Sequence, residues 1–267
     1  MNGPLFQHTW RSQRLKLFLV SIALLIWGGL QPVIYARFGS QFKALLDSGI
    51  FPQQFARLGS GDIFSLSGAV ALGLIHPIGL LLTSVFAVGF STSAIAGERQ
   101  RGTLEVVLAR PVGRRSLYFT LLAASFGFVG LAIAALLAGA VAGSFAAGVL
   151  GEFPLGELPL LWLNAVLLFG SFAAIGLAAS VSFDRFTPAL GWTMGIVIVM
   201  YVLEVLGSLW PAAEFLQPYS LFHYLKPKAI MTGVVDPLDF AVLAGAVITA
   251  IGWAVTVFPR RDLAAPI

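Results

Sequence analysis

Six long hydrophobic segments, separated by more polar loops, make up most of the chain. Each is about as long as, or longer than, the roughly 20 residues that an α-helix needs to cross a bilayer. The second and third exceed that length, which predicts that they tilt, kink or extend beyond the membrane. The six segments cover residues 15–35, 66–96, 117–150, 158–181, 188–209 and 238–258.

The composition agrees with this pattern. Of the 267 residues, 58% are hydrophobic and only 10% are charged, and the mean hydropathy is +0.91. A soluble protein of this size cannot bury that many apolar side chains in its core. The 29 glycines fit helices that approach closely in lipid. Cysteine is absent, which excludes disulfides and thiolate metal sites. We therefore predict an all-α, polytopic membrane protein that forms a single helical bundle over residues 1–267.

The basic residues predict the orientation of this bundle. Cytoplasmic loops of membrane proteins carry an excess of Lys and Arg. With six transmembrane helices and both termini cytoplasmic, the inside segments hold eleven of the 16 basic residues. The first span follows basic residues, as a signal peptide does, but its long apolar core and the poor cleavage site "YARFGS" favour an uncleaved span. The eleven are Arg11, Arg14, Lys16, Arg99, Arg101, Arg110, Arg114, Arg115, Arg185, Arg260 and Arg261.

Three segments outside the spans mix aromatic and polar residues. Residues 1–14 predict a basic interfacial helix on the cytoplasmic side. We predict that residues 36–65 form short amphipathic segments at the extracellular interface. We predict that residues 210–236 form an extracellular re-entrant or interfacial segment. The alternative for all three is that their aromatic residues simply anchor the spans at the headgroups.

The most charged segment, "GERQRGTLEVVLARPVGRR", covers residues 97–115 between the second and third spans. Gly102 permits a break in the chain, and Thr103 is a good N-cap for a short helix, with Glu105 in its favoured first turn. Pro111 ends that helix, which is about two turns and roughly 10 Å long. Leu104, Val107 and Leu108 fall on one face, and Arg101 and Glu105 on another. The segment therefore predicts a shaped docking element on the cytoplasmic side.

This segment resembles the conserved loop of type-2 ABC-transporter permeases, usually E-x-x-x-G-T-L-E-x-L-L-x-x-P-V followed by arginine. The similarity extends to "FPQQFARLGSGDIFSLSGAVAL" and to the six-span plan, but only residues 95–115 are specific. Many members have Gly-Lys after the last arginine, where this chain reads "SLYFTLLAA". The alternative is a positive-inside anchor with a fortuitous Gly-Thr-Leu-Glu. The matching positions are Glu98, Gly102, Thr103, Leu104, Glu105, Pro111, Val112 and Arg115.

The resemblance implies that residues 97–115 form the coupling loop, whose helix receives the motion of an ATP-binding subunit. We add Arg101 and Leu108, on the two faces of the predicted helix, to the candidate ATPase contacts. The resemblance also implies two copies of the ATP-binding subunit and a second permease, identical or homologous, in a bacterial or archaeal plasma membrane. Candidates for lining the substrate path, on the second and fifth spans, are His76, Thr83, Phe86, Phe90, Thr193, Met200 and Tyr201.

These features predict the permease subunit of an ATP-driven ABC exporter with a hydrophobic or amphipathic substrate. The chain has no G-x-x-x-x-G-K-[ST] motif, so ATP and magnesium are expected in the partner ATPase. We expect no catalytic residue, no metal, no cofactor in this chain and no nucleic-acid partner. Two alternatives stay open: a membrane component of a maturation or immunity system, resembling the permeases of nitrous-oxide reductase assembly, and an ion-coupled secondary transporter, for which paired midplane charges are missing.

A few polar or small residues within the spans are individual candidates. His76 precedes Pro77, where we expect a bend and a neutral histidine that satisfies the freed carbonyl. Glu204, near the outer end of the fifth span, is expected to snorkel or to pair with a basic residue such as Lys226 or Lys228. Asp184 and Arg185 are interpreted as a helix terminus, with a secondary ATPase contact as the alternative. Small-residue stripes at Ala135, Gly139 and Gly143, and at Gly191 and Gly195, predict close helix packing within the protomer or in a dimer.

Overall fold

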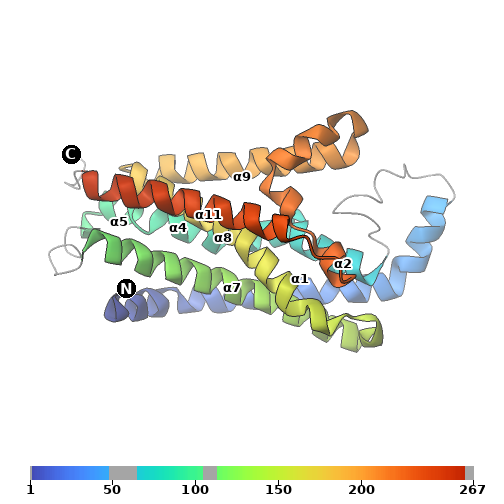
Figure 1. Cartoon of the computed structure of the whole chain (residues 1–267). Coiled ribbons are helices and arrows are strands. Elements are labelled where there is room, and N and C mark those ends of the chain that lie inside the picture. Colours follow the sequence, from blue (N-terminus) through green and yellow to red (C-terminus); the bar gives the residue numbers. More distant parts are fainter. Residues whose placement is uncertain (1, 48–64, 105–112, 262–267) are drawn as a thin grey trace.

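The computed structural model describes residues 2–47, 65–104 and 113–261, and in these ranges the chain is helical with no strand. The helices lie side by side in an elongated bundle (Figure 1). Five of them are long and apolar enough to cross a membrane. They are α1 (Gly3–Asp47), α7 (Arg114–Ala146), α8 (Leu158–Ser182), α9 (Phe186–Leu209) and α11 (Pro237–Val257).

A sixth span, the second in chain order, is broken. Its two halves are bent by 47° on either side of His76, so the described residues contain five spans, or six if the pair is one span. The bend expected at His76-Pro77 is therefore present. The segment consists of α2 (Leu66–Ile75), α3 (Pro77–Ser84), the π-helix η2 (Val85–Phe90), α4 (Ser91–Ser93) and α5 (Ala96–Gln100).

The role expected for His76 at this bend differs in detail. His76 has extended backbone geometry, with φ −61° and ψ 142°, as a residue before proline prefers. Its Nδ1 atom accepts a hydrogen bond from the Ile78 amide at 3.2 Å, and its ring lies 4.8 Å from that of Trp27. His76 thus caps the first turn of α3, whereas we had expected it to satisfy a carbonyl group freed by Pro77.

The first helix is longer than the predicted span. Residues 3–14, expected as a separate interfacial helix, form the first turns of α1 and continue into the span without a break. At the other end α1 continues to Asp47, through part of the segment expected to hold short amphipathic pieces. The rest of that segment, residues 48–64, lies outside the described residues. Residues 15–35 therefore form only the middle of one continuous helix.

Close packing of α1 on α7 explains one small-residue stripe. A Cβ atom added at Gly139 would collide with the carbonyl oxygen of Leu25, and one at Gly143 would collide with that of Gly29. These backbones approach so closely that only glycine fits. The stripe of the third span thus serves contacts within the protomer. The stripe of α9 differs, because a Cβ at Gly191 or Gly195 would meet nothing within 4 Å.

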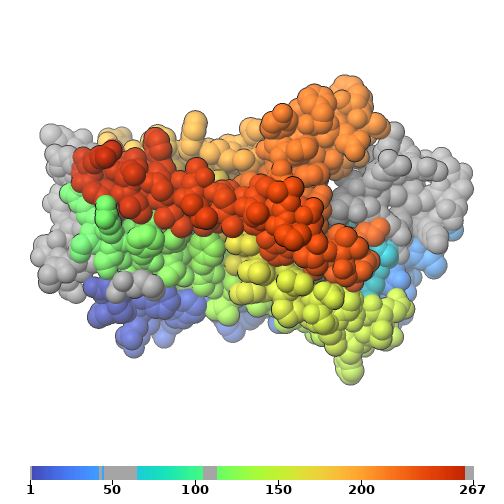
Figure 2. Space-filling view, viewed as in Figure 1, coloured from blue at the N-terminus to red at the C-terminus, as the bar shows by residue number. Residues whose placement is uncertain are grey.

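Short helices connect the long ones at the end of the bundle away from α5. Between α9 and α11, the chain forms a projection from the bundle (Figures 1 and 2). The projection holds η5 (Pro211–Tyr219), whereas η6 (Leu221–Tyr224) and α10 (Pro227–Met231) return to the bundle and pack in its core. The segment 210–236, predicted to be re-entrant or interfacial, thus contains three short helices. The remaining short helices are η3 (Leu150–Glu152), η4 (Leu155–Glu157) and η7 (Phe258–Arg260).

The start of α1, α5, the start of α7 and the end of α11 all lie at one end of the bundle, which we call the α5 end (Figure 1). The first and last described residues therefore lie at the same end of the bundle, as an even number of spans requires. α9 and α11 are the most peripheral spans, with only 17% of each apolar window buried, against 72% for α8. The core of the bundle thus lies around α8 and α7.

Candidate functional site

The segment that leads into the predicted coupling loop is fixed to the turn between α8 and α9. The hydroxyl of Ser180, at the end of α8, accepts hydrogen bonds from the amides of Ile95 and Ala96 at 3.1 and 2.8 Å. It also donates to the carbonyl of Thr92 at 2.7 Å. Ser180 is 1% exposed. One buried hydroxyl therefore satisfies three backbone groups at the point where α4 and α5 meet, and joins the second span to the fourth.

Ion pairs extend this connection to the end of the chain. Nη1 of Arg99, on α5, lies 2.6 Å from the Asp184 carboxylate, and Arg261 forms an ion pair with the same carboxylate oxygen. The Arg99 side chain is only 10% exposed. Arg261 also donates to the carbonyl of Val181 at 2.9 Å. Asp184 therefore holds two arginines from distant parts of the sequence.

A further hydrogen bond completes this arrangement. The side-chain oxygen of Gln100 accepts from the amide of Phe186, the first residue of α9, at 3.0 Å. We call Arg99, Gln100, Ser180, Asp184 and Arg261 the clamp. The clamp ties α5 to α8, to α9 and to the residues after α11.

Arg114, the first residue of α7, reinforces the same end of the bundle. Its Nη1 atom donates to the carbonyls of Phe258, Pro259 and Arg261, at 3.2, 3.1 and 2.8 Å. The start of the third span and the end of the sixth are thereby joined. Positive charge beside these carbonyls also complements the C-terminal end of α11.

The coupling motif itself begins with a left-handed turn. Gly102 has φ +72°, a conformation that favours glycine, so the break expected there is present. Arg101 forms an ion pair with Glu98, three residues earlier, on a surface where the two side chains are 61% and 36% exposed. The Thr103 hydroxyl donates to the carboxylate and, at 3.1 Å, to the carbonyl of Glu98. Glu98 is thus held by Arg101 and Thr103, and its side chain remains accessible.

The other predicted coupling residues divide into two groups. Leu104 is 2% exposed and packs in the core, whereas Arg115 is exposed at the start of α7. Glu105, Leu108 and Pro111 lie outside the described residues, as does most of the predicted coupling helix.

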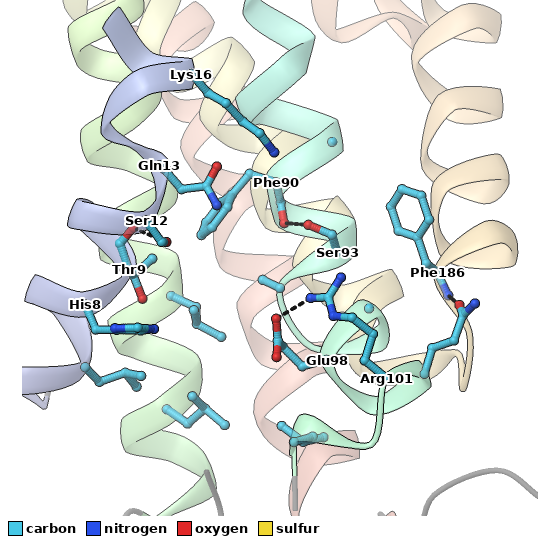
Figure 3. Close-up of a pocket in the computed structure, with 18 of the residues that line it drawn as sticks. His8, Thr9, Ser12, Gln13, Lys16, Phe90, Ser93, Glu98, Arg101 and Phe186 are labelled. Atoms are coloured by element: carbon cyan, nitrogen blue, oxygen red, sulfur yellow. Dashed lines mark hydrogen bonds and ion pairs between the residues drawn. The ribbon is translucent and has the colours of Figure 1, made fainter. Parts of the chain in front are cut away.

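A cavity of about 770 Å³ lies beside this motif, between the start of α1 and the lower part of the second span (Figure 3). One wall carries polar residues of α1, and the opposite wall carries the end of the second span with Glu98 and Arg101. Leu117 and Leu121 of α7 close it from a third side. We call it the α1 cavity.

A second, smaller cavity of about 160 Å³ lies near the bend of the second span. It joins His76 and Tyr201 to Glu204 and His223. Oε1 of Glu204 accepts a hydrogen bond from Gln217 at 3.2 Å, and Oε2 lies 3.9 Å from Nδ1 of His223.

The basic side chain within 4 Å of Glu204 is therefore that of His223. Among the described residues, no ion pair within 4 Å joins Glu204 to Lys226 or Lys228, although Lys226 lines the same cavity. Burial and, to a smaller extent, the Lys226 charge lower the pKa of His223, which lies outside the spans. His223 is therefore neutral at neutral pH.

The candidate path residues fall in three environments. His76 and Tyr201 line the small cavity, and Phe90 lines the α1 cavity. Thr83, Phe86 and Thr193 are at most 1% exposed within this chain. The hydroxyl groups of Thr83 and Thr193 each donate a hydrogen bond to a carbonyl group of their own helix. Phe86 and Phe90 both pack on Phe128, with ring centroids 5.1 Å away. Met200 is half-buried, and its carbonyl accepts from Ser220 at 2.7 Å.

The clamp is the feature that sequence reasoning missed. Asp184 and Arg185 looked like a simple helix terminus, and Arg261 counted only toward topology. One signal was available: Asp184 is an acidic residue at the end of a span, on the side of the bundle where most of the other charged residues are basic. Nothing in the linear sequence specified which arginines would meet it. Among the described residues, no group of three or more His, Cys, Asp or Glu side chains lies in a position to hold a metal ion.

Comparison with known proteins gives one finding that covers nearly the whole chain. The sequence model of a family described as ABC-2 family transporter protein matches residues 6–263. The matched range contains the clamp, the small cavity and all but the first residues of the candidate spans and of the α1 cavity lining. No curated protein and no solved structure matches the chain.

Proposed function

This chain belongs to the ABC-2 transporter family, and on that premise we propose that it is the permease subunit of an ATP-driven exporter. Membership makes it a multi-pass membrane subunit that works with an ABC ATP-binding subunit. Our proposal adds two copies of that subunit, which would bind ATP and magnesium, and a second permease, identical or homologous. We place the complex in a bacterial or archaeal inner membrane with the α5 end in the cytoplasm.

The observation that carries this proposal is the fixed position of α5. Glu98 and Thr103 belong to the coupling motif and lie directly beside the clamp. Force applied to the loop that follows would therefore reach α8, α9 and the end of α11 through short polar contacts. A loop that served only as a basic topology anchor would need none of these contacts.

We propose that closure of the ATP-binding subunits pushes on the helix expected over residues 103–110, with Glu98 and Glu105 contacting the ATPase surface. The clamp would then move the second, fourth and fifth spans together. The bend at His76 and the π-helix at Val85–Phe90 are irregular points at which the second span can change shape. Movement there would open a path for a hydrophobic or amphipathic substrate.

Co-expression tests the proposal directly. The chain would be expressed with the Walker-motif ATPase whose gene lies nearest to its own, and purified through a tag on the permease. We expect the ATPase to co-purify in equal amounts, and its ATP hydrolysis to change when the permease is present. Failure of every such ATPase to bind the permease in detergent and in nanodiscs would contradict the proposal and favour an ion-coupled transporter. Binding without ATP-driven release of any cargo would favour the maturation or immunity role.

A further inference from the structure

The α1 cavity has an unusual wall for a helix that continues into a span. Five polar residues of α1 line it at the spacing of one helical face, where a bundle normally places apolar residues (Figure 3). Leu5 continues the same face at its lower end. Over this stripe α1 rises about 12 Å. The five are His8, Thr9, Ser12, Gln13 and Lys16.

The opposite wall is carved out by small residues. Gly89, Ser93, Ala94 and Gly97 follow one another along the second span at helical spacing and all line the cavity. A Cβ added at Gly89 would meet its nearest neighbour only at 3.8 Å, so the space in front of this glycine is free. Val85 and Phe90 add apolar side chains to the same wall. Its volume of about 770 Å³ is large enough for a headgroup and the first part of an acyl chain.

The charge in this cavity is unbalanced. Glu98 and Arg101 pair with each other on one wall. Lys16, on the other wall, has no carboxylate within 4 Å among the described residues, and Figure 3 shows its side chain projecting into the space between α1 and the second span. A lysine between Leu15 and Leu17, at the start of the hydrophobic segment, lies near the depth of the headgroups.

An apolar track leads away from Lys16. Ile78, Leu81 and Val85 lie on one face of the second span at positions i, i+3 and i+7, and they are 44%, 69% and 39% exposed. Val85 also lines the cavity, so the track begins where the cavity ends. Polar donors and a cation at one end, with an exposed apolar helix face at the other, match a molecule that has an anionic head and a hydrocarbon tail.

We propose that the α1 cavity binds the anionic headgroup of an amphiphile from the adjoining leaflet, with Lys16 as its counter-charge. The polar stripe of α1 hydrogen-bonds the rest of the headgroup, and the tail lies along the track from Val85 to Ile78. This inference deepens the proposed function by naming a substrate class and rests on it for the role of substrate. The site itself needs no ATPase, so it can be tested alone.

The test uses lipid quenching in nanodiscs. The chain has no native cysteine, so a bimane label can be placed at Leu19→Cys alone, an exposed position one turn beyond Lys16 and outside the cavity lining. A second label, at Ile248→Cys on exposed α11, reports bulk lipid. Phosphatidylglycerol or phosphatidylcholine carrying a nitroxide at acyl carbon 5 is then titrated into the discs. We expect half-quenching of the Leu19 label at an about fivefold lower fraction of the anionic lipid, with no preference at Ile248.

Matched variants define the site. Lys16→Gln and Gly89→Leu should abolish the preference, and Lys16→Arg should keep it. Gly252→Leu, which places the same side chain in open space on α11, should also keep it. Melting temperatures would verify that each variant is folded. Equal quenching by both lipids at Leu19, or a preference that persists in Lys16→Gln, would overturn the proposal.

Two further experiments distinguish a lipid headgroup from a free phosphate anion, and distinguish the proposed lipid site from the proposed exporter function. Excess glycerol 1-phosphate should leave the preference intact, and its loss would assign the site to a free phosphate anion instead of a lipid. A lipid preference without ATP-dependent transport would keep the site but reject the exporter. ATP-coupled transport with no lipid preference would keep the exporter function but reject the lipid site.

Discussion

At the scale of single residues, the polar side chains at the α5 end are placed to satisfy more than one partner each. Ser180 satisfies three backbone groups, and Asp184 holds two arginines. A buried group that loses its partner, such as a backbone group bonded to Ser180, keeps its full desolvation cost. Substitution of a shared partner should therefore have effects beyond one contact.

The first prediction concerns Asp184→Asn. The change removes the charged partner of the ion pair that Asp184 forms with Arg99, whose side chain is 10% exposed. Because Asp184 itself is 48% exposed, we expect a loss of about 1–3 kcal/mol in unfolding free energy, between the ranges for surface and buried pairs. Thermal unfolding in detergent measures it. Glu214→Gln, at an exposed carboxylate of η5, should change stability by less than about 0.5 kcal/mol; equal effects of the two variants would argue against the clamp.

A second prediction concerns the pH dependence of stability near His223. Burial and the nearby Lys226 charge place the pKa of His223 below its usual 6.5 in the folded protein. The unfolded chain therefore binds the proton first as the pH falls below about 6.5, and folding stability contributed by neutral His223 is lost. The melting temperature should fall from pH 7.5 to 5.5, and His223→Gln should reduce that fall. An unchanged pH slope in the variant would show that other groups control it.

At the scale of whole elements, the helices differ in how their close contacts are made. α1 and α7 meet through glycines whose neighbours are backbone atoms, whereas the α9 glycines face open space. Backbone cannot yield to a new side chain as a flexible side chain can. The two stripes look alike in sequence, so only the structure separates a packing contact from an unpartnered face.

Gly139→Leu should therefore be severely destabilising, by more than the about 1–3 kcal/mol typical of overpacking. Its Cβ would collide with the backbone of Leu25, so α1 and α7 would have to separate. Gly252→Leu is the matched control, because nothing lies within 4 Å of its Cβ. The folded yield and melting temperature of the two variants measure the difference. Similar values for both would contradict the observed α1–α7 approach.

Hydrophobic periodicity and length predicted where the spans lie, because a bilayer imposes a length on any helix that crosses it. The bend at His76-Pro77 and the turn at Gly102 were also predictable, since proline and glycine restrict or free the backbone locally. The clamp was not, because Arg99, Asp184 and Arg261 meet only after three helices have packed. Sequence also failed to show that residues 3–14 continue into α1, since a polar segment before a span can lie in the interface or extend the helix.

At the scale of the whole molecule, the α5 end gathers the termini, the coupling motif, the clamp and the α1 cavity. The other end holds the short helices between α7 and α8 and between α9 and α11, and the small cavity lies on that side of the bend at His76. A family that couples an ATPase on one side to a path across the membrane needs a mechanical link between the two, and α8 and α9 run from the clamp to the other end. The account therefore predicts that coupling depends on the surface presented by Glu98 and on the clamp behind it.

The most direct test compares Glu98→Arg with the charge swap Glu98→Arg/Arg101→Glu, in vesicles that contain the permease and its ATPase. Both reverse the charge at Glu98, but the swap keeps an ion pair between positions 98 and 101. If Glu98 contacts the ATPase, both variants should hydrolyse ATP with transport per ATP reduced about tenfold or more, as loss of a charge-assisted contact of about 1.5–3 kcal/mol implies. Full recovery of coupling in the swap would show that Glu98 acts only within this chain, and would contradict the account.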